Sequence, residues 1–263
     1  MRNVSRLFLF ALILCGVMAC QPKAVKYTLV QYNVGAFKKY DDSSIDAIAR
    51  VVKELDADAV TFNEVDSCTR RTGNVDQMKA FAESMGDWNQ FYAAAMPFRG
   101  GAYGVGVASS PDLKVVRTDR IALPKLNGYE PRAVAISEYK DFILCSTHLD
   151  LTLESQLGQI ETINHYIDSV YADCNKPIFI GGDFNALPDS ESIKLMQETW
   201  QLLTPLDFSF PSPSPSRCID YVFVRPNGKE VVVESVEIVS HLETADPATA
   251  SDHLPVVVKV TIK

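Results

Sequence analysis

Two kinds of hydrophobic spacing alternate along the chain from about residue 26 to its end. Spacings of three and four residues predict helices, whereas strict alternation and short uninterrupted apolar runs predict strands. Helical spacing occurs over residues 43–55, 75–85, 153–171 and 190–198. Strand-like runs occur over residues 27–32, 59–62, 91–95, 104–108, 115–122, 133–137, 142–147, 178–180, 221–224, 231–239 and 255–262.

The order of these elements indicates the fold class. Neighbouring strands that resemble hairpins are mixed with helical crossovers, and neither an internal repeat nor a long linker divides the chain. A doubly wound parallel sheet would show helices between nearly all of its strands. The pattern therefore predicts an α/β sandwich in a single domain, with two packed sheets and helices outside. Polar clusters follow several strands, so we expect the loops at one end of the sheets to form a cleft.

Residues 1–19 follow a different pattern. Two arginines precede the apolar run Leu7–Met18, which is too short to span a bilayer comfortably. The following Ala19-Cys20 resembles the end of a bacterial lipobox, although Met18 is not the usual small residue there. We expect a lipoprotein-type signal peptide over residues 1–19, lipidation of Cys20, and a tether over residues 20–25. An ordinary secretory signal is the alternative. The leader predicts an exported protein, anchored to a membrane in a bacterial envelope.

Composition and charge narrow the class of protein. With 47% apolar and 22% charged residues the chain is typical of globular proteins, and residues 26–263 have the size of one large domain. The net charge of −8 disfavours binding of nucleic acid regardless of its sequence, which relies on clustered Lys and Arg. A local basic groove is compatible with an acidic total, so nucleic acid remains an unfavoured partner. Beyond Cys20, the spacings of the four cysteines match no zinc-site pattern.

Polar clusters at strand ends carry the candidate chemistry. Hydrolysis of a phosphoester needs a cation for the phosphoryl oxygens, an activated water and help for the leaving oxygen. Glu64, Asp183 and Asp252 each lie near a strand end and offer the oxygen ligands that Mg²⁺ prefers. Asp183 follows two glycines, and Asn185 lies one strand period further on the same side. These clusters suggest a metal-assisted phosphoester hydrolase.

Two histidines complete this set. His253 has Asp252 beside it and Asp220 available to hold its other ring nitrogen, which favours a catalytic role over that of a buried core histidine. His148 is a second histidine at a strand end, and Asp150 lies one strand period beyond it.

Six short motifs occur along the chain: Gln31-Tyr32-Asn33-Val34-Gly35, Asn63-Glu64-Val65, Thr147-His148-Leu149, Gly182-Asp183-Phe184-Asn185, Ile219-Asp220-Tyr221 and Ser251-Asp252-His253. In order and spacing they resemble those of the endonuclease/exonuclease/phosphatase superfamily. This superfamily includes deoxyribonuclease-I-like nucleases, abasic-site endonucleases, neutral sphingomyelinases and inositol-phosphate 5-phosphatases. The resemblance covers the whole mature chain and implies a four-layer, deoxyribonuclease-I-like sandwich.

The resemblance implies a role for each motif. Glu64 would bind Mg²⁺, with Mn²⁺ as an alternative, beside Asn33 and Asp252. Asp183 would orient or deprotonate the attacking water, and Asn185 would hold a phosphate oxygen.

Both histidines would act on the phosphate. His253, oriented by Asp220, would contact the scissile group. His148 would stabilise the transition state or protonate the leaving group. Tyrosine is common at this last position in abasic-site enzymes, so a histidine points away from them.

Three further residues are candidates for substrate binding. Arg132 lies in a segment that resembles one that can carry a phosphate-binding arginine in the family. Arg71 follows the Glu64 loop, and Tyr103 belongs to the glycine-rich stretch 96–104. For each of them, a position in a solvated turn or strand start is the alternative.

The leading hypothesis is an exported Mg²⁺-dependent phosphodiesterase acting on a small molecule or a lipid headgroup. The alternative is a nonspecific extracellular nuclease, and a non-catalytic binding protein on the same fold is disfavoured because every catalytic side chain is present. The expected partners are a phosphoester substrate and, through the lipid, a membrane; no protein partner is inferred.

Overall fold

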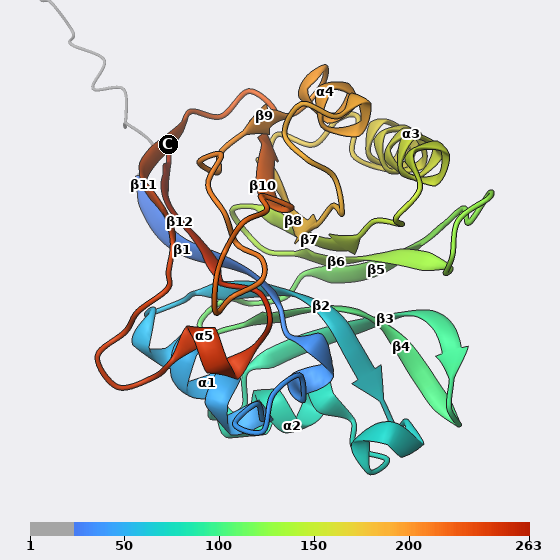
Figure 1. Cartoon of the computed structure of the whole chain (residues 1–263). Helices are drawn as coiled ribbons and strands as arrows, with labels where there is room; N and C mark the ends of the chain where they lie inside the picture. The colour runs from blue at the N-terminus through green and yellow to red at the C-terminus, as the bar shows by residue number, and fades with distance from the viewer. Residues whose placement is uncertain (1–23) are drawn as a thin grey trace, which may run out of the picture.

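The computed structural model describes residues 24–263, so the expected signal peptide, Cys20 and most of the expected tether lie outside the described residues. Two mixed six-stranded sheets pack face to face (Figure 1). The first has the order β11-β12-β1-β2-β4-β3, with strands Val231–Ile238, Val256–Ile262, Val25–Asn33, Ala59–Ser67, Gly101–Ser109 and Asn89–Phe98. The second has the order β5-β6-β7-β8-β10-β9, with strands Arg117–Leu123, Arg132–Glu138, Ile143–His148, Ile178–Asp183, Asp220–Arg225 and Gln201–Leu202.

Helices cover the outer face of each sheet. In Figure 1, α1 (Ile45–Glu54) and α2 (Gln77–Ser84) lie below the first sheet, with α5 (Pro247–Ala250) beside α1. The second sheet is covered by α3 (Leu153–Val170) and α4 (Glu191–Gln197). The predicted single-domain, four-layer α/β sandwich is confirmed. Among residues 24–263, no helix is both long enough and apolar enough to cross a membrane.

Three apolar clusters hold the layers together. One joins α1 and α2 to the first sheet, a second joins α3 and α4 to the other sheet, and a third fills the space between the sheets. Fully buried side chains such as Phe62, Ile163 and Phe179 represent the three clusters. Burial of each such side chain contributes roughly 1.5–3 kcal/mol, so the sandwich forms a rigid support for the loops at its ends.

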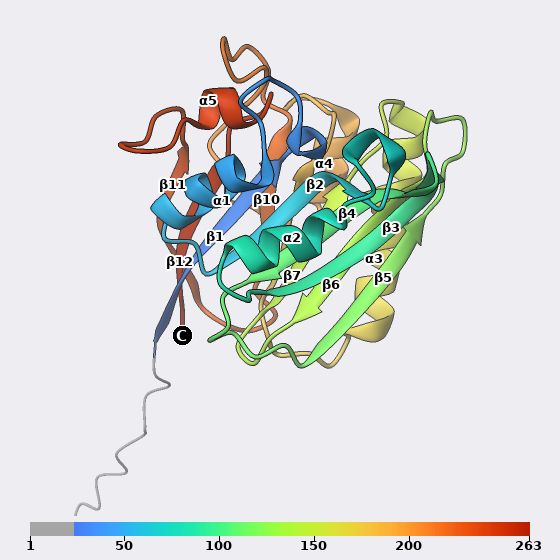
Figure 2. The same cartoon turned by 90° about the horizontal axis from the view of Figure 1, so that it is seen from below.

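Two parallel strand pairs determine where those loops meet. β1 pairs with β2 through the crossover helix α1, and β7 pairs with β8 through α3, whereas the other pairings are antiparallel. Figure 2 shows that β1 begins at the end of the molecule where the C-terminus lies and runs to the opposite end. The carboxyl ends of the parallel strands are therefore at one end of the sandwich.

Strand β2 extends further than the hydrophobic pattern predicts. The expected strand ends at Phe62, but pairing with β4 resumes at Val65 after a β-bulge. Glu64 lies in this bulge with φ of 57°, a left-handed conformation that costs a residue with a side chain about 1–2 kcal/mol. The bulge redirects the Glu64 side chain, so this acid is inside a strand rather than beyond its end.

Candidate active site

The strand pairs bring polar side chains together at one end of the sandwich. Asn33 lies opposite Asn63 in the β1–β2 pair, and His148 lies opposite Asp183 in the β7–β8 pair. Asp220 begins β10 and is the antiparallel partner of Asp183. Because register fixes these neighbours, the sheets themselves position four of the predicted site residues.

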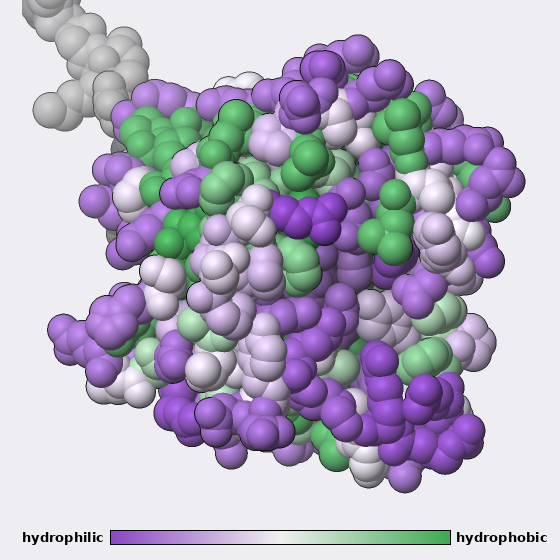
Figure 3. Space-filling model, in the orientation of Figure 1, coloured by the Kyte–Doolittle hydropathy of each residue, from purple (hydrophilic) through white to green (hydrophobic). Residues whose placement is uncertain are grey.

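His148 and Asp183 line a cleft of about 410 Å³. Figure 3 looks onto this end, where hydrophilic residues fill the middle of the face and apolar patches lie on its upper half. The cleft brings together charged, imidazole and apolar side chains: Lys39, Glu64, Arg71, Met96, Phe98, Tyr103, Glu130, Arg132, His148, Leu151, Asp183, Asn185, Phe210, Arg217, Ile219, Asp252 and His253.

Asp183 is the centre of the polar network. Its Oδ2 accepts a hydrogen bond from Asn33 Nδ2 at 3.1 Å and lies 3.6 Å from His148 Nε2 and 3.7 Å from His253 Nε2. Its Oδ1 accepts from the backbone N–H of Asn185 at 2.9 Å. Burial raises the pKa of Asp183 to about 7 against the opposing effect of nearby His253, which suits a general base at neutral pH.

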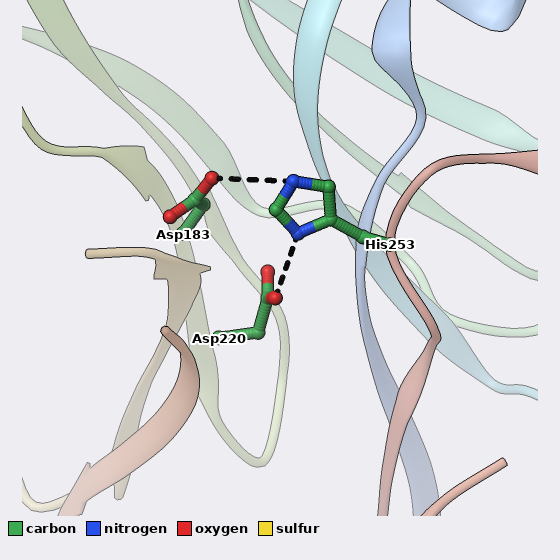
Figure 4. Close-up of side chains that lie close together, drawn as sticks. All are labelled: Asp183, Asp220 and His253. Carbon is green, nitrogen blue, oxygen red and sulfur yellow. Dashed lines mark hydrogen bonds and ion pairs between the residues drawn. The ribbon is translucent and has the colours of Figure 1, made fainter. Parts of the chain in front are cut away.

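His253 and Asp220 form a buried pair beside it (Figure 4). His253 Nδ1 lies 2.8 Å from Asp220 Oδ2, and its Nε2 faces Asp183. Burial alone would lower the pKa of His253, but the charge of Asp220 and their hydrogen bond, with help from Asp183 and Asp252, raise it to about 9. The imidazolium at neutral pH can therefore donate a hydrogen bond from Nε2 into the cleft.

His148 has the opposite electrostatic setting. Burial lowers its pKa well below the usual value, and the positive charges of Arg132, His253 and Lys39 lower it further. Arg132 lies 3.2 Å from Nδ1, and Asn185 Nδ2, which also donates to the Leu149 carbonyl, lies 3.0 Å from Nε2. A guanidinium and an amide NH₂ can only donate, so both ring nitrogens face donors. His148 is thus a neutral imidazole held between two donors, and its Nε2 faces Asp183 as that of His253 does.

The family of the protein follows from a comparison with sequence models. The model described as "Endonuclease/Exonuclease/phosphatase family" matches residues 30–253, well over half of the chain. The chain belongs to the endonuclease/exonuclease/phosphatase family. The resemblance in the six motifs is confirmed, and membership makes the protein a metal-dependent phosphoester hydrolase. No curated protein is similar enough in sequence to match it.

Solved structures of family members share the fold. A family protein from Bacteroides thetaiotaomicron superposes with a TM-score of 0.74 at 17% identity, covering 91% of this chain and 96% of the other. A mannosyl-6-phosphatase from the same species gives 0.72 at 18%, covering 90% and 99%. The 2′,3′-cyclic phosphatase ANGEL2 gives 0.68 at 13%, covering 90% and 95%. At such identities these likenesses show the fold alone.

Glu64 and Asp252 fit the divalent cation that the family uses. Both carboxylates line the cleft, and Asp252 Oδ1 is buried without a hydrogen-bond partner, as expected of an oxygen reserved for a ligand. Asn33 is turned differently from the prediction: its Oδ1 accepts from the Gly35 N–H at 3.1 Å, so its Nδ2 faces Glu64 and Asp183. This orientation makes Asn33 an aligning donor to two carboxylates rather than an oxygen ligand.

A second set of donors could also hold a metal. Ligand atoms of Asp183, Asp220 and His253 all lie within 4.8 Å of one another and are buried. However, Asp220 already accepts hydrogen bonds from Ser209 and Gln31 in addition to its pairing with His253. Because these lone pairs are used, the Glu64–Asp252 side fits a hydrated hard cation better.

The substrate-binding candidates line the cleft, but two are already engaged. Arg71 forms a two-point ion pair with buried Asp66 (2.7 and 2.8 Å) and stacks over Phe98 at 4.6 Å. Arg132 is 5% exposed and contacts Glu130 at 3.3 Å and His148. Its buried Nε has no partner. Arg132 is therefore placed to hold His148, and only part of its guanidinium remains for a phosphate.

Sequence reasoning missed three features of the site. The Asn63 side chain links the two sheets by hydrogen bonds. Its Oδ1 accepts from the Asp183 N–H (2.9 Å) and from Gln31 Nε2 (2.5 Å). Its Nδ2 donates to the Thr147 carbonyl (2.6 Å). Lys39 lines the cleft next to Glu64 and Asp252. An apolar wall is formed by Leu151, Phe210 and Ile219. The pairing of Asn63 with Asn33 in neighbouring strands could have placed Asn63 near the site. Nothing in the sequence distinguishes Lys39 from Lys38.

Proposed function

We propose that the protein is an exported, Mg²⁺-dependent hydrolase of a phosphodiester in a small molecule or lipid headgroup. One observation supports this type of reaction. A buried carboxylate with a pKa near neutrality, Asp183, lies between a protonated and a neutral histidine and beside two carboxylates that suit a cation. Such a set combines general base, hydrogen-bond donors and charge neutralisation within one cleft.

Each side chain has a place in the reaction. Glu64 and Asp252 would hold the divalent cation, which supplies positive charge to the phosphoryl oxygens. Asp183 takes the proton from the attacking water, aligned by Asn33. His253 Nε2 donates to a phosphoryl oxygen while Asp220 keeps its ring charged and oriented. His148, held between Arg132 and Asn185, would contact a second phosphoryl oxygen or the leaving group.

The charge of the cleft favours a small substrate over nucleic acid. Positive and negative groups nearly balance in its lining: Glu64, Glu130, Asp183 and Asp252 against Lys39, Arg71, Arg132, Arg217 and the imidazolium of His253. A nucleic-acid groove instead uses uncompensated Lys and Arg along the backbone. The apolar wall of Leu151, Phe210 and Ile219 suits an organic group attached to the phosphate. Structural relatives that act as a mannosyl-6-phosphatase and a 2′,3′-cyclic phosphatase are consistent with small phosphoesters.

Export and anchoring belong to the proposal through the leader pattern ending at Cys20. Labelling of cells with a palmitate analogue tests this part. The wild-type chain should be labelled and Cys20→Ala should not. Equal labelling of both would remove the anchor from the proposal.

The substrate class is tested by comparing four kinds of ester in Mg²⁺: plasmid DNA, phospholipid diesters, inositol phosphodiesters and sugar phosphate monoesters. Asp183→Asn serves as the blank, and Asp189→Asn, an acid on the loop before α4, serves as the matched control. Cleavage of a lipid or small diester, lost only in Asp183→Asn, supports the proposal. Nicking of the plasmid would make the protein a nuclease, and cleavage of monoesters alone would make it a phosphomonoesterase.

A further inference from the structure

Lys39 places a positive charge between the two carboxylates assigned to the cation. Its Nζ lies 2.9 Å from Asp252 Oδ2 and 3.5 Å from Glu64 Oε2. The Lys39 side chain is 36% exposed and lines the cleft, whereas the two carboxylates are 21% and 16% exposed. The ammonium therefore occupies one oxygen of each carboxylate assigned to the cation, Asp252 Oδ2 and Glu64 Oε2.

The backbone of the preceding turn builds this position. Gly35, Ala36 and Phe37 all have left-handed conformations, with φ of 52°, 54° and 55°. Phe37 is buried against Phe62, which fixes the turn despite its strain. The Lys39 side chain lies directly over Gly35, so closely that a Cβ on residue 35 would be only 2.1 Å from Lys39 Cγ.

Lys38 shows that this placement is not a general property of a surface lysine in this loop. Its Nζ points to another partner, the backbone oxygen of Arg71, at 2.8 Å, and it does not line the catalytic cleft. Two adjacent lysines therefore differ in direction, and only Lys39 reaches the carboxylates.

We propose that Lys39 is a phosphate-binding residue that competes with the divalent cation for Glu64 and Asp252 and transfers to the substrate phosphoryl group when the cation binds. Glu64, Asp252 and Lys39 together carry a net charge of −1, and a bound divalent cation would change this to +1. A positive site no longer retains the ammonium, but it attracts a phosphate. The flexible four-carbon stem of lysine permits this exchange without backbone movement. The inference rests on the cation assignment made above.

Calorimetric titration with Mg²⁺ alone tests the competition, and titration with inorganic phosphate at saturating Mg²⁺ tests the transfer. In Lys39→Met, the affinity for Mg²⁺ should rise about three- to tenfold, the scale of two partly exposed ion pairs. The affinity for phosphate should fall about tenfold or more, the scale of a lost hydrogen bond from a charged donor. Lys38→Met is the matched control and should leave both affinities unchanged.

Three results would overturn the inference. Unchanged or weaker Mg²⁺ binding by Lys39→Met would show that the ammonium does not compete. Unchanged phosphate binding would show that it does not transfer. Glu64→Gln is the third arm: if its Mg²⁺ affinity equals that of the wild type, the cation assignment fails and the Lys39 proposal fails with it, whichever esters the enzyme cleaves.

Discussion

Replacement of Asn63 by alanine should strongly destabilise the fold, although Asn63 does not line the cleft. Its side chain makes three hydrogen bonds, to Gln31, the Thr147 carbonyl and the Asp183 N–H, and all three partner residues are buried. A buried polar group left without a partner costs about 1–3 kcal/mol. The Thr147 carbonyl and the Asp183 N–H would lose this partner, and Gln31 Nε2 would keep only its hydrogen bond to Asp220. With partial relief by water entering the space of the lost amide, the free energy of unfolding should fall by about 3–5 kcal/mol.

Urea unfolding followed by circular dichroism measures this loss, with a constant slope against denaturant as the sign that the mechanism of unfolding is unchanged. Asn127→Ala is the control, because Asn127 is exposed and donates only to Glu154. It should change stability by less than about 0.5 kcal/mol. If Asn63→Ala also lost less than about 1 kcal/mol, the three buried groups would have found other partners. Asn63 would then not be the link between the sheets.

Three other predictions concern the site. Asp220→Asn should lower turnover by about 10²–10⁴-fold, because His253 loses the partner that orients and charges it; near-native steady-state turnover would remove Asp220 from the mechanism. The folded-state pKa of His253, about 9, exceeds the unfolded value of about 6.5, so its stabilisation is complete below about pH 6.5 and is lost as the pH rises through 9. Thermal unfolding midpoints of the wild type should fall over that interval, and those of Asp220→Asn should fall less. Chelation should abolish hydrolysis and Mg²⁺ should restore it, whereas Glu64→Gln should need a higher Mg²⁺ concentration; activity that persists in excess chelator would contradict the cation assignment.

The sandwich and most of the cleft could be predicted because strand spacing is a local signal. Asp183 and His148 each follow an uninterrupted apolar run, and the parallel pairing of those runs places the two side chains opposite each other. The same reasoning placed Glu64 just beyond a strand, and there it was wrong. The bulge that turns Glu64 inward depends on pairing with β4, which the sequence around Glu64 does not encode.

Side-chain direction outside the strands was the part that sequence could not provide. Lys38 and Lys39 are chemically identical neighbours, and only the left-handed turn at residues 35–37 separates their directions. Arg71 was predicted to face a substrate, yet its guanidinium is held by Asp66, an acid that no motif singled out. The catalytic roles implied by the resemblance remain predictions, which the variants above are designed to test.

The direction of β1 affects what an anchored form of this enzyme could reach. The strand begins at Val25 and ends at Asn33, which at about 3.3 Å per residue separates the first described residues from the catalytic groups by roughly 26 Å. A six-residue tether extends to about 20 Å at most. A lipid on Cys20 would thus hold the molecule with its cleft directed away from the membrane, toward the surrounding solution. Of the two substrate classes proposed above, this orientation would favour a soluble small phosphoester over the lipid headgroups of the same bilayer.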